Sequence, residues 1–160
     1  MKKLKIYLES TVFNRYFEPE RDSCGETKLL FAEIAAGKFE AYTSVYVVKE
    51  LMDTEDELKR NSMLGLISGY DMTILDESQA IEALAKAYVT HGVITEPHYY
   101  DRMHLACASV NGLDAIISYN FSHINRKKTK ELTGPVNVLY GYRNIYIGLP
   151  MEVIENDESV

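Results

Sequence analysis

The chain has 160 residues, of which 46% are hydrophobic and 26% charged, as in one ordinary globular domain. No apolar run approaches the length of a membrane span, and polar residues interrupt the basic amino-terminal segment before it resembles a secretory signal. We therefore expect a folded, cytoplasmic protein that does not enter a membrane. The net charge of −7 argues against broad nonspecific attraction to nucleic acid, but bound cations would cancel the charge of a local site.

The apolar pattern alternates short strands with amphipathic helices along the whole chain. The first half predicts, in order, a strand over 4–8, a short helix capped by Ser10 or Thr11, a helix over 27–36, a strand over 39–43, a helix from Ser44 through Leu51 and a helix from 54 to about 67. The second half predicts a strand over 72–75, a helix over 77–91, a helix opened by Pro97 and stopped by Gly112, a strand over 115–117, a basic helix over 121–132 and a strand over 145–148. Short strands separated by helices indicate an α/β domain with a mainly parallel sheet of four or five strands.

Polar side chains recur where these strands end and the following helices begin. Glu9 directly follows the first strand, and Glu50 lies about two turns into a later helix. Asp101 lies at the start of another helix, and Asn120 follows a buried strand. The carboxyl ends of parallel strands meet at one edge of the sheet, so we expect Glu9, Glu50 and Asn120 to converge there. Asp101 joins them if its helix packs across the same edge.

Each of these residues also has a purely structural interpretation. Glu9 and Asp101 are acids at helix amino termini, where the helix dipole favours them, and Glu50 belongs to an acidic helix surface. Asn120 is a common residue where strands end. His104, three residues after Asp101, lacks a second such pair that would complete a transition-metal site, and we interpret it as structural.

Three carboxylates in one crevice repel one another unless they are protonated or share a cation. Carboxylate oxygens suit Mg²⁺ or Mn²⁺, which retain open positions for phosphate oxygens. Such a site favours hydrolysis of phosphodiester bonds. Basic residues 126–128 and Lys130 follow the last of these positions, and they either contact RNA phosphates or form an ordinary solvated helix face.

Four strings in the right order resemble the PIN domain, a fold of small metal-dependent ribonucleases that includes toxins of toxin-antitoxin pairs. These strings are YLESTVF with Glu9, SVYVVKELMDT with Glu50, DRMHLACA with Asp101, and SYNFSHI with Ser118 and Asn120. The closing segment VNVLYGYRNIYIGLP is also similar to that of the family. The match runs almost from end to end.

The resemblance implies a three-layer α/β/α sandwich over residues 1–150, followed by an acidic tail over 151–160. It implies an endoribonuclease that uses Mg²⁺ or Mn²⁺, with Glu9, Glu50 and Asp101 as metal ligands and Asn120 as a further catalytic residue. Ser118 would support this site, and Arg126, Lys127 and Lys128 are candidate RNA contacts. RNA, a cognate antitoxin and a second copy of the chain, forming a homodimer, are the implied partners.

Two positions depart from the family pattern. Glu9 stands where the family commonly has Asp, and its extra methylene moves the carboxylate outward. Asn120 retains an oxygen but lacks a charge, so we expect one metal ion rather than two before RNA binds. These departures favour an alternative function, a degenerate PIN domain that binds RNA or a protein without cleaving. A nucleotide-binding module is a further alternative, but the chain has no glycine-rich phosphate loop.

Overall fold

The computed structural model describes residues 2–158, and within them helices and strands alternate as the sequence predicts. The strands are β1 (Leu4–Leu8), β2 (Phe39–Ser44), β3 (Thr73–Leu75), β4 (Ala115–Ile117) and β5 (Tyr146–Gly148). The helices are α1 (Ser10–Tyr16), α2 (Ser23–Ala35), α3 (Val45–Met52), α4 (Glu57–Gly69), α5 (Gln79–Thr90), α6 (Tyr99–Val110), α7 (Lys127–Leu139) and α8 (Pro150–Glu158).

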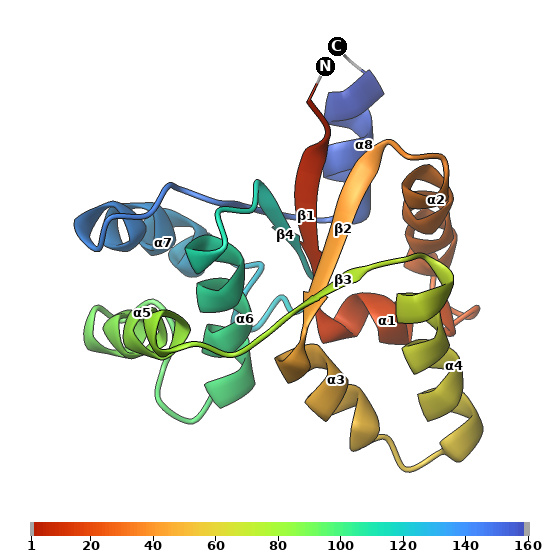
Figure 1. The fold of residues 1–160 in the computed structure, drawn as a ribbon, viewed down its shortest axis with the longest axis horizontal. Helices are drawn as coiled ribbons and strands as arrows, with labels where there is room; N and C mark the ends of the chain where they lie inside the picture. Colours follow the sequence, from red (N-terminus) through yellow and green to blue (C-terminus); the bar gives the residue numbers. More distant parts are fainter. Residues whose placement is uncertain (1, 159–160) are drawn as a thin grey trace.

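The strands form one parallel sheet in the order β3-β2-β1-β4-β5. Helices α5, α6 and α7 lie on one side of this sheet, and α1, α2 and α4 lie on the other (Figure 1). Helix α8 packs against α2. The arrangement confirms the predicted α/β class and the parallel sheet. The sheet has five strands, the larger of the two predicted numbers.

The central strands carry apolar residues in unbroken runs because both faces of the sheet are covered. The side chains of Ile6, Tyr7 and Leu8 in β1 are fully buried, as are those of Ile116 and Ile117 in β4. Burying large apolar side chains supplies the main driving force for folding, so these two strands fix the centre of the domain.

The pairing of β1 with β4 brings two distant parts of the chain together at the carboxyl edge of the sheet. Leu8 pairs with Ile117, and the Glu9 amide continues the ladder by donating to the carbonyl of Ile117 at 3.2 Å. The next residue of the neighbouring strand, Ser118, donates its amide to the carbonyl of Gly148 at 3.1 Å. The strand register therefore sets residue 9 beside residue 118.

The prediction of a helix over 121–132 is wrong at both ends, because α7 covers Lys127–Leu139. The Asn120 carbonyl accepts hydrogen bonds from the amides of Ile124 and Asn125, and Arg126 has an extended backbone, so turns occupy the first part of the predicted range. The helix then continues beyond Leu132, the predicted end, and through Pro135 to Leu139.

Residues 151–158, assigned from the sequence to an acidic tail, belong to helix α8. The side chains of Val153 and Ile154 are buried in the same core as the sheet, so this helix is part of the domain packing. Residues 159 and 160 lie outside the described range. No helix of the described residues is long and apolar enough to cross a membrane.

Candidate active site

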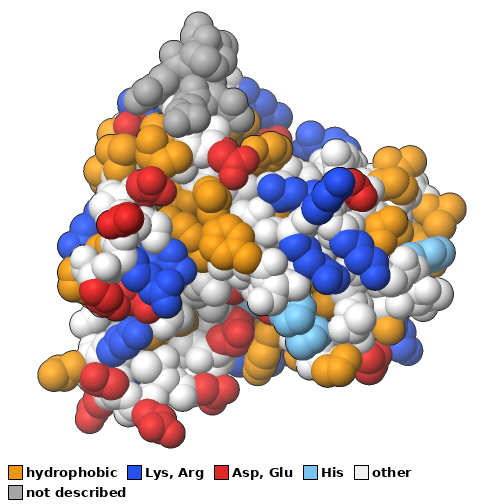
Figure 2. Space-filling view, turned by 180° about the vertical axis from the view of Figure 1, so that it is seen from behind, with side chains coloured by type: hydrophobic (Ala, Val, Ile, Leu, Met, Phe, Trp, Pro, Cys, Tyr) orange, Lys and Arg blue, Asp and Glu red, His pale blue; other side chains and the backbone are white. Residues whose placement is uncertain are grey.

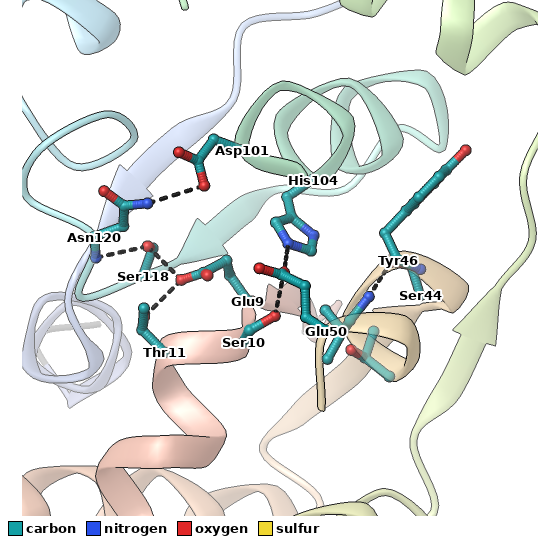
Figure 3. Close-up of polar contacts among 12 residues, drawn as sticks. Glu9, Ser10, Thr11, Ser44, Tyr46, Glu50, Asp101, His104, Ser118 and Asn120 are labelled. Carbon is teal, nitrogen blue, oxygen red and sulfur yellow. Dashed lines mark hydrogen bonds and ion pairs between the residues drawn. The ribbon is translucent and has the colours of Figure 1, made fainter. Parts of the chain in front are cut away.

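Glu9 is a buried carboxylate at the junction between β1 and α1, with only 2% of its surface exposed. Its Oε1 atom accepts hydrogen bonds from the hydroxyl groups of Ser118 at 2.6 Å and Thr11 at 2.5 Å (Figure 3). Burial raises the pKa of Glu9, although these hydroxyl groups and the nearby His104 oppose the rise. The sequence position of Thr11 suggested that it caps α1. In the structure it binds the Glu9 carboxylate instead.

Glu50 reaches the same edge from helix α3, which Ser44 caps as predicted by accepting from the amides of Tyr46 at 3.1 Å and Val47 at 3.4 Å. The Oε1 atom of Glu50 accepts a hydrogen bond from Ser10 at 2.6 Å and another from Nε2 of His104. Burial alone would raise the pKa of Glu50, but the hydrogen bond and positive charge of His104 lower it.

His104 is fully buried and connects Glu50 to a chain of hydroxyl groups. Its Nδ1 atom lies 2.7 Å from the Tyr7 hydroxyl, which lies 2.6 Å from the hydroxyl of Ser44. Burial disfavours the protonated ring, but the hydrogen bond and charge of Glu50 raise the pKa of His104 overall. The protonated ring, and the neutral ring with its hydrogen on Nε2, can each donate a hydrogen bond from Nε2 to the Glu50 carboxylate. This histidine holds Glu50 in place.

Asp101 lies in the first turn of α6 and is oriented by Asn120. The Asn120 side-chain amide donates to Oδ1 of Asp101 at 3.0 Å, and its own Oδ1 accepts from the amide of His123 at 2.9 Å. Exchanging the oxygen and nitrogen of Asn120 would set acceptor against acceptor and donor against donor, so the hydrogen bonds determine this orientation. Asn120 thus offers Asp101 a donor and commits its oxygen elsewhere.

Glu9, Glu50 and Asp101 come from three separate elements and lie around one region (Figure 3). The charge of Glu50 raises the pKa of Glu9 and of Asp101, although burial is the main cause for both. Among residues 2–158, every side-chain hydrogen bond to these three carboxylates goes to a single oxygen of each, Oε1 or Oδ1. The second oxygen of each group is left for another ligand.

This donor set fits a hard divalent cation. Within the described part of the chain, no Lys or Arg forms an ion pair with any of the three carboxylates, and their one ion pair is that of Glu50 with His104. When His104 is protonated, its positive charge offsets one of the three carboxylate charges. One Mg²⁺ or Mn²⁺ ion balances the two negative charges that remain. Glu9, Glu50 and His104 each offer a ligand atom within 4.8 Å of the others, but Asp101 is outside this group.

The basic residues that were predicted to contact RNA differ in their exposure and in the partners that they already have. Arg126 donates to Thr129 Oγ1 at 2.9 Å and to the carbonyl of Val93 at 3.4 Å, so its guanidinium group supports the turn before α7. Lys127 is 90% exposed, with a distant partner in Glu131 at 3.9 Å, and Lys128 is also exposed. Lysine and arginine side chains gather on one face of the molecule, beside histidine side chains (Figure 2).

Sequence reasoning missed two features of the site. His104 was interpreted as structural, and its position three residues after Asp101 was the available signal that both face the same side of α6. The hydroxyl groups of Ser10 and Thr11 were expected to cap a helix, yet they bind Glu50 and Glu9. Their positions next to Glu9 in the sequence were the available signal. The partner of Ser10 could not be predicted, because it depends on how α3, which carries Glu50, packs.

By sequence, the chain matches no protein-family model and no curated protein. By structure it is similar to a chain of VapBC2 from Rickettsia felis, solved with a DNA fragment from the promoter of the pair, at a TM-score of 0.57 and 12% identity, covering 90% of this chain and 97% of that one. It is also similar to VapC20 of Mycobacterium tuberculosis, described as a toxin that cleaves the sarcin-ricin loop, at a TM-score of 0.56 and 12% identity, covering 88% and 98%. The chain therefore has the fold of VapC toxins, the PIN-domain fold that its sequence motifs predict.

Proposed function

We propose that this protein is a toxin-like endoribonuclease that hydrolyses RNA phosphodiester bonds with Mg²⁺ or Mn²⁺. The observation that carries the proposal is the convergence of Glu9, Glu50 and Asp101, each with one carboxylate oxygen that no described residue binds. The structural similarity to VapC20, a toxin that cleaves the sarcin-ricin loop, supports the same class of activity on this fold.

In this proposal Glu9, Glu50 and Asp101 hold the ion, and other residues position them. Ser118 and Thr11 fix Glu9, His104 and Ser10 fix Glu50, and Asn120 fixes Asp101. When bound, the ion supplies charge that activates a water molecule and neutralises the phosphate. Fixed ligand geometry matters because loss of a residue that merely orients a ligand commonly lowers metal affinity about 10–100-fold.

The test is cleavage of RNA by the purified protein with Mg²⁺ or Mn²⁺ added after chelation. We expect Glu50→Gln and Asp101→Asn to lower the cleavage rate by at least about 100-fold, since each variant removes a ligand itself. Glu77→Gln is the matched control, because Glu77 is an exposed carboxylate paired with Lys49 at 3.6 Å. Cleavage that survives both ligand substitutions would contradict the proposal.

One observation favours the alternative, a PIN-like domain that binds RNA or a protein without cleaving. His104 already supplies a positive partner to Glu50, so the carboxylates are partly compensated without a metal ion. Calorimetric titration with Mn²⁺ separates the two functions. Binding that Glu50→Gln abolishes supports the nuclease, whereas RNA binding without any Mn²⁺ binding supports the alternative.

We propose Lys127 and Lys128 as contacts for RNA phosphates, because both are exposed at the start of α7. Arg126 is a weaker candidate, since its guanidinium group is bound to Thr129 and Val93. Phosphate contacts are sensitive to salt. Replacing both lysines with alanine should therefore weaken RNA binding and reduce its salt dependence.

We also propose an antitoxin and a second copy of the chain as protein partners. Large apolar side chains are exposed near the carboxyl end of α7 and on β5, including Leu139, which is 67% exposed, and Tyr146, which is 43% exposed. Exposed apolar groups of this kind commonly mark protein contacts. Light scattering over a range of concentrations measures self-association, and a monomer throughout would exclude the homodimer.

A further inference from the structure

A second group of potential metal ligands lies beside the carboxylates, and it has a different composition. His98, Asp101 and His123 each offer a ligand atom, and these atoms all lie within 4.8 Å of one another. His98 is the residue before α6, Asp101 lies in its first turn, and His123 lies in the turns after β4. The fold thus brings two imidazole rings from distant parts of the chain to one carboxylate.

The two rings are close together, and their nitrogen atoms form no hydrogen bond with any residue that the structure describes. Their centroids are 3.5 Å apart and their planes differ by 26°. The backbone amide of His98 donates to the carbonyl of Thr95 at 3.1 Å, and that of His123 donates to Asn120 at 2.9 Å, so both residues are anchored. Within residues 2–158, no hydrogen bond reaches a ring nitrogen of either histidine.

Two imidazole nitrogens and one carboxylate oxygen form a ligand set that suits transition metals better than Mg²⁺. Zn²⁺ sites with three protein ligands of nitrogen and oxygen retain an open position for water. A nitrogen lone pair lies in the plane of its ring, so the stacked rings must tilt apart at one edge to bind the same ion. His98 and His123 are both half-buried, so each residue is partly open to solvent.

We propose that His98, Asp101 and His123 bind one divalent transition-metal ion of the Zn²⁺ class, at a site distinct from the Glu9 and Glu50 carboxylates. This site goes beyond the proposed nuclease activity and does not require it. The two sites share Asp101, whose Oδ1 atom Asn120 holds at 3.0 Å and whose other oxygen is available.

The test uses Co²⁺ as a probe, because its visible absorption bands report nitrogen ligands, followed by displacement with Zn²⁺. The variants are His98→Phe and His123→Phe, which retain a ring for stacking but remove the ligand nitrogens. His91→Phe is the matched control, because His91 contacts Tyr140 and lies outside the group. Circular dichroism checks that each variant is folded. We expect each ligand variant to weaken Co²⁺ binding by at least about tenfold, and the control to bind like the wild type.

Glu50→Gln distinguishes this site from the carboxylate site. Co²⁺ bands that persist in this variant support the proposal, whether or not the protein cleaves RNA. Absence of Co²⁺ bands in the wild type would overturn it. Binding that His98→Phe leaves intact, or that Glu50→Gln abolishes, would assign the ion to other ligands and would overturn it too.

Discussion

Glu9 has two opposing effects on the molecule, since its charge is costly in the metal-free protein and useful for binding a cation. The side chain is 2% exposed, burial raises its pKa, and Glu50 raises the pKa further by repulsion. Ionisation is therefore harder in the folded chain than in the unfolded chain. The contribution of Glu9 to the free energy of unfolding therefore decreases as the pH rises through its raised pKa.

We predict that Glu9→Gln increases the free energy of unfolding of the metal-free protein at neutral pH while abolishing the binding of Mg²⁺ or Mn²⁺ at the carboxylate site. The Gln oxygen can still accept the hydrogen bonds of Ser118 and Thr11. The gain should disappear at acidic pH, where the wild-type carboxyl group is itself neutral. Urea unfolding of both proteins in chelator across this pH range measures the difference. A variant less stable than the wild type at neutral pH would show that its neighbours stabilise the charge.

Asn120 allows a second test at the level of one residue. Its amide donates to Asp101 at 3.0 Å, so Asn120→Asp sets two carboxylates against each other. We predict a loss of about 1–3 kcal/mol in the free energy of unfolding without metal, because a hydrogen bond to a charged group is lost. Affinity for Mn²⁺ should rise, since the added charge favours a cation.

Urea unfolding and calorimetry with Mn²⁺ measure these two effects. Asn111→Asp is a suitable control, because Asn111 caps the far end of α6 and donates to the carbonyl of Cys107 at 2.8 Å. It adds the same charge away from the carboxylates, and its Mn²⁺ affinity should match that of the wild type. Equal Mn²⁺ affinity in Asn120→Asp and the wild type would contradict the prediction.

At the scale of elements, helix α3 is the support that carries Glu50 into the site. Its capping residue Ser44 is fully buried, binds the amides of Tyr46 and Val47, and contacts the Tyr7 hydroxyl at 2.6 Å. Removing such a cap commonly costs about 0.5–2 kcal/mol. The start of the helix and the Tyr7–His104 connection should loosen together.

We predict that Ser44→Ala lowers both stability and cleavage, whereas Ser78→Ala lowers stability alone. Ser78 caps α5 by accepting from the amide of Ile81 at 3.2 Å, so this variant tests the loss of a cap elsewhere in the fold. Thermal unfolding and the RNA cleavage rate measure the two effects. Equal loss of activity in both variants would indicate a general effect of stability.

The same elements show what could be predicted from the sequence. Strand β4 and helix α3 were recognisable because an unbroken apolar run and a capping serine are local signals. The bounds of α7 were not, because Asn120 forms turns through its own carbonyl and Gly134 allows close approach of Asn144. A Cβ atom at Gly134 would lie 2.7 Å from Asn144 Oδ1, a contact between distant residues that no local pattern reveals.

At the scale of the whole molecule, parallel topology explains why residues 9, 50 and 120 could be expected at one edge from strand order alone. The hydrogen bonds that each of them forms with its neighbours depend on register and helix packing. Glu9 lies beside Ser118 because Leu8 pairs with Ile117, and His104 reaches Glu50 because α3 contacts α6. Glu50 and His104 are 54 positions apart in the sequence, so this pairing is a property of the folded chain only.

The proposed ion should also stabilise the entire fold, because its ligands come from the β1–α1 junction, α3 and α6 and are assembled only in the folded chain. A ligand at about 100 times its Kd adds roughly 2.7 kcal/mol to the free energy of unfolding. For a domain of this size that corresponds to an increase in Tm on the order of 5–10 °C.

Thermal unfolding with Mn²⁺, and again after chelation, measures the shift, and sodium chloride at equal ionic strength controls for screening. Glu9→Gln should start from a higher Tm and show no shift, because it lacks both the buried charge and a ligand. An equal shift in sodium chloride, or in Glu9→Gln, would mean that the ion acts on the acidic surface and not at the carboxylate site.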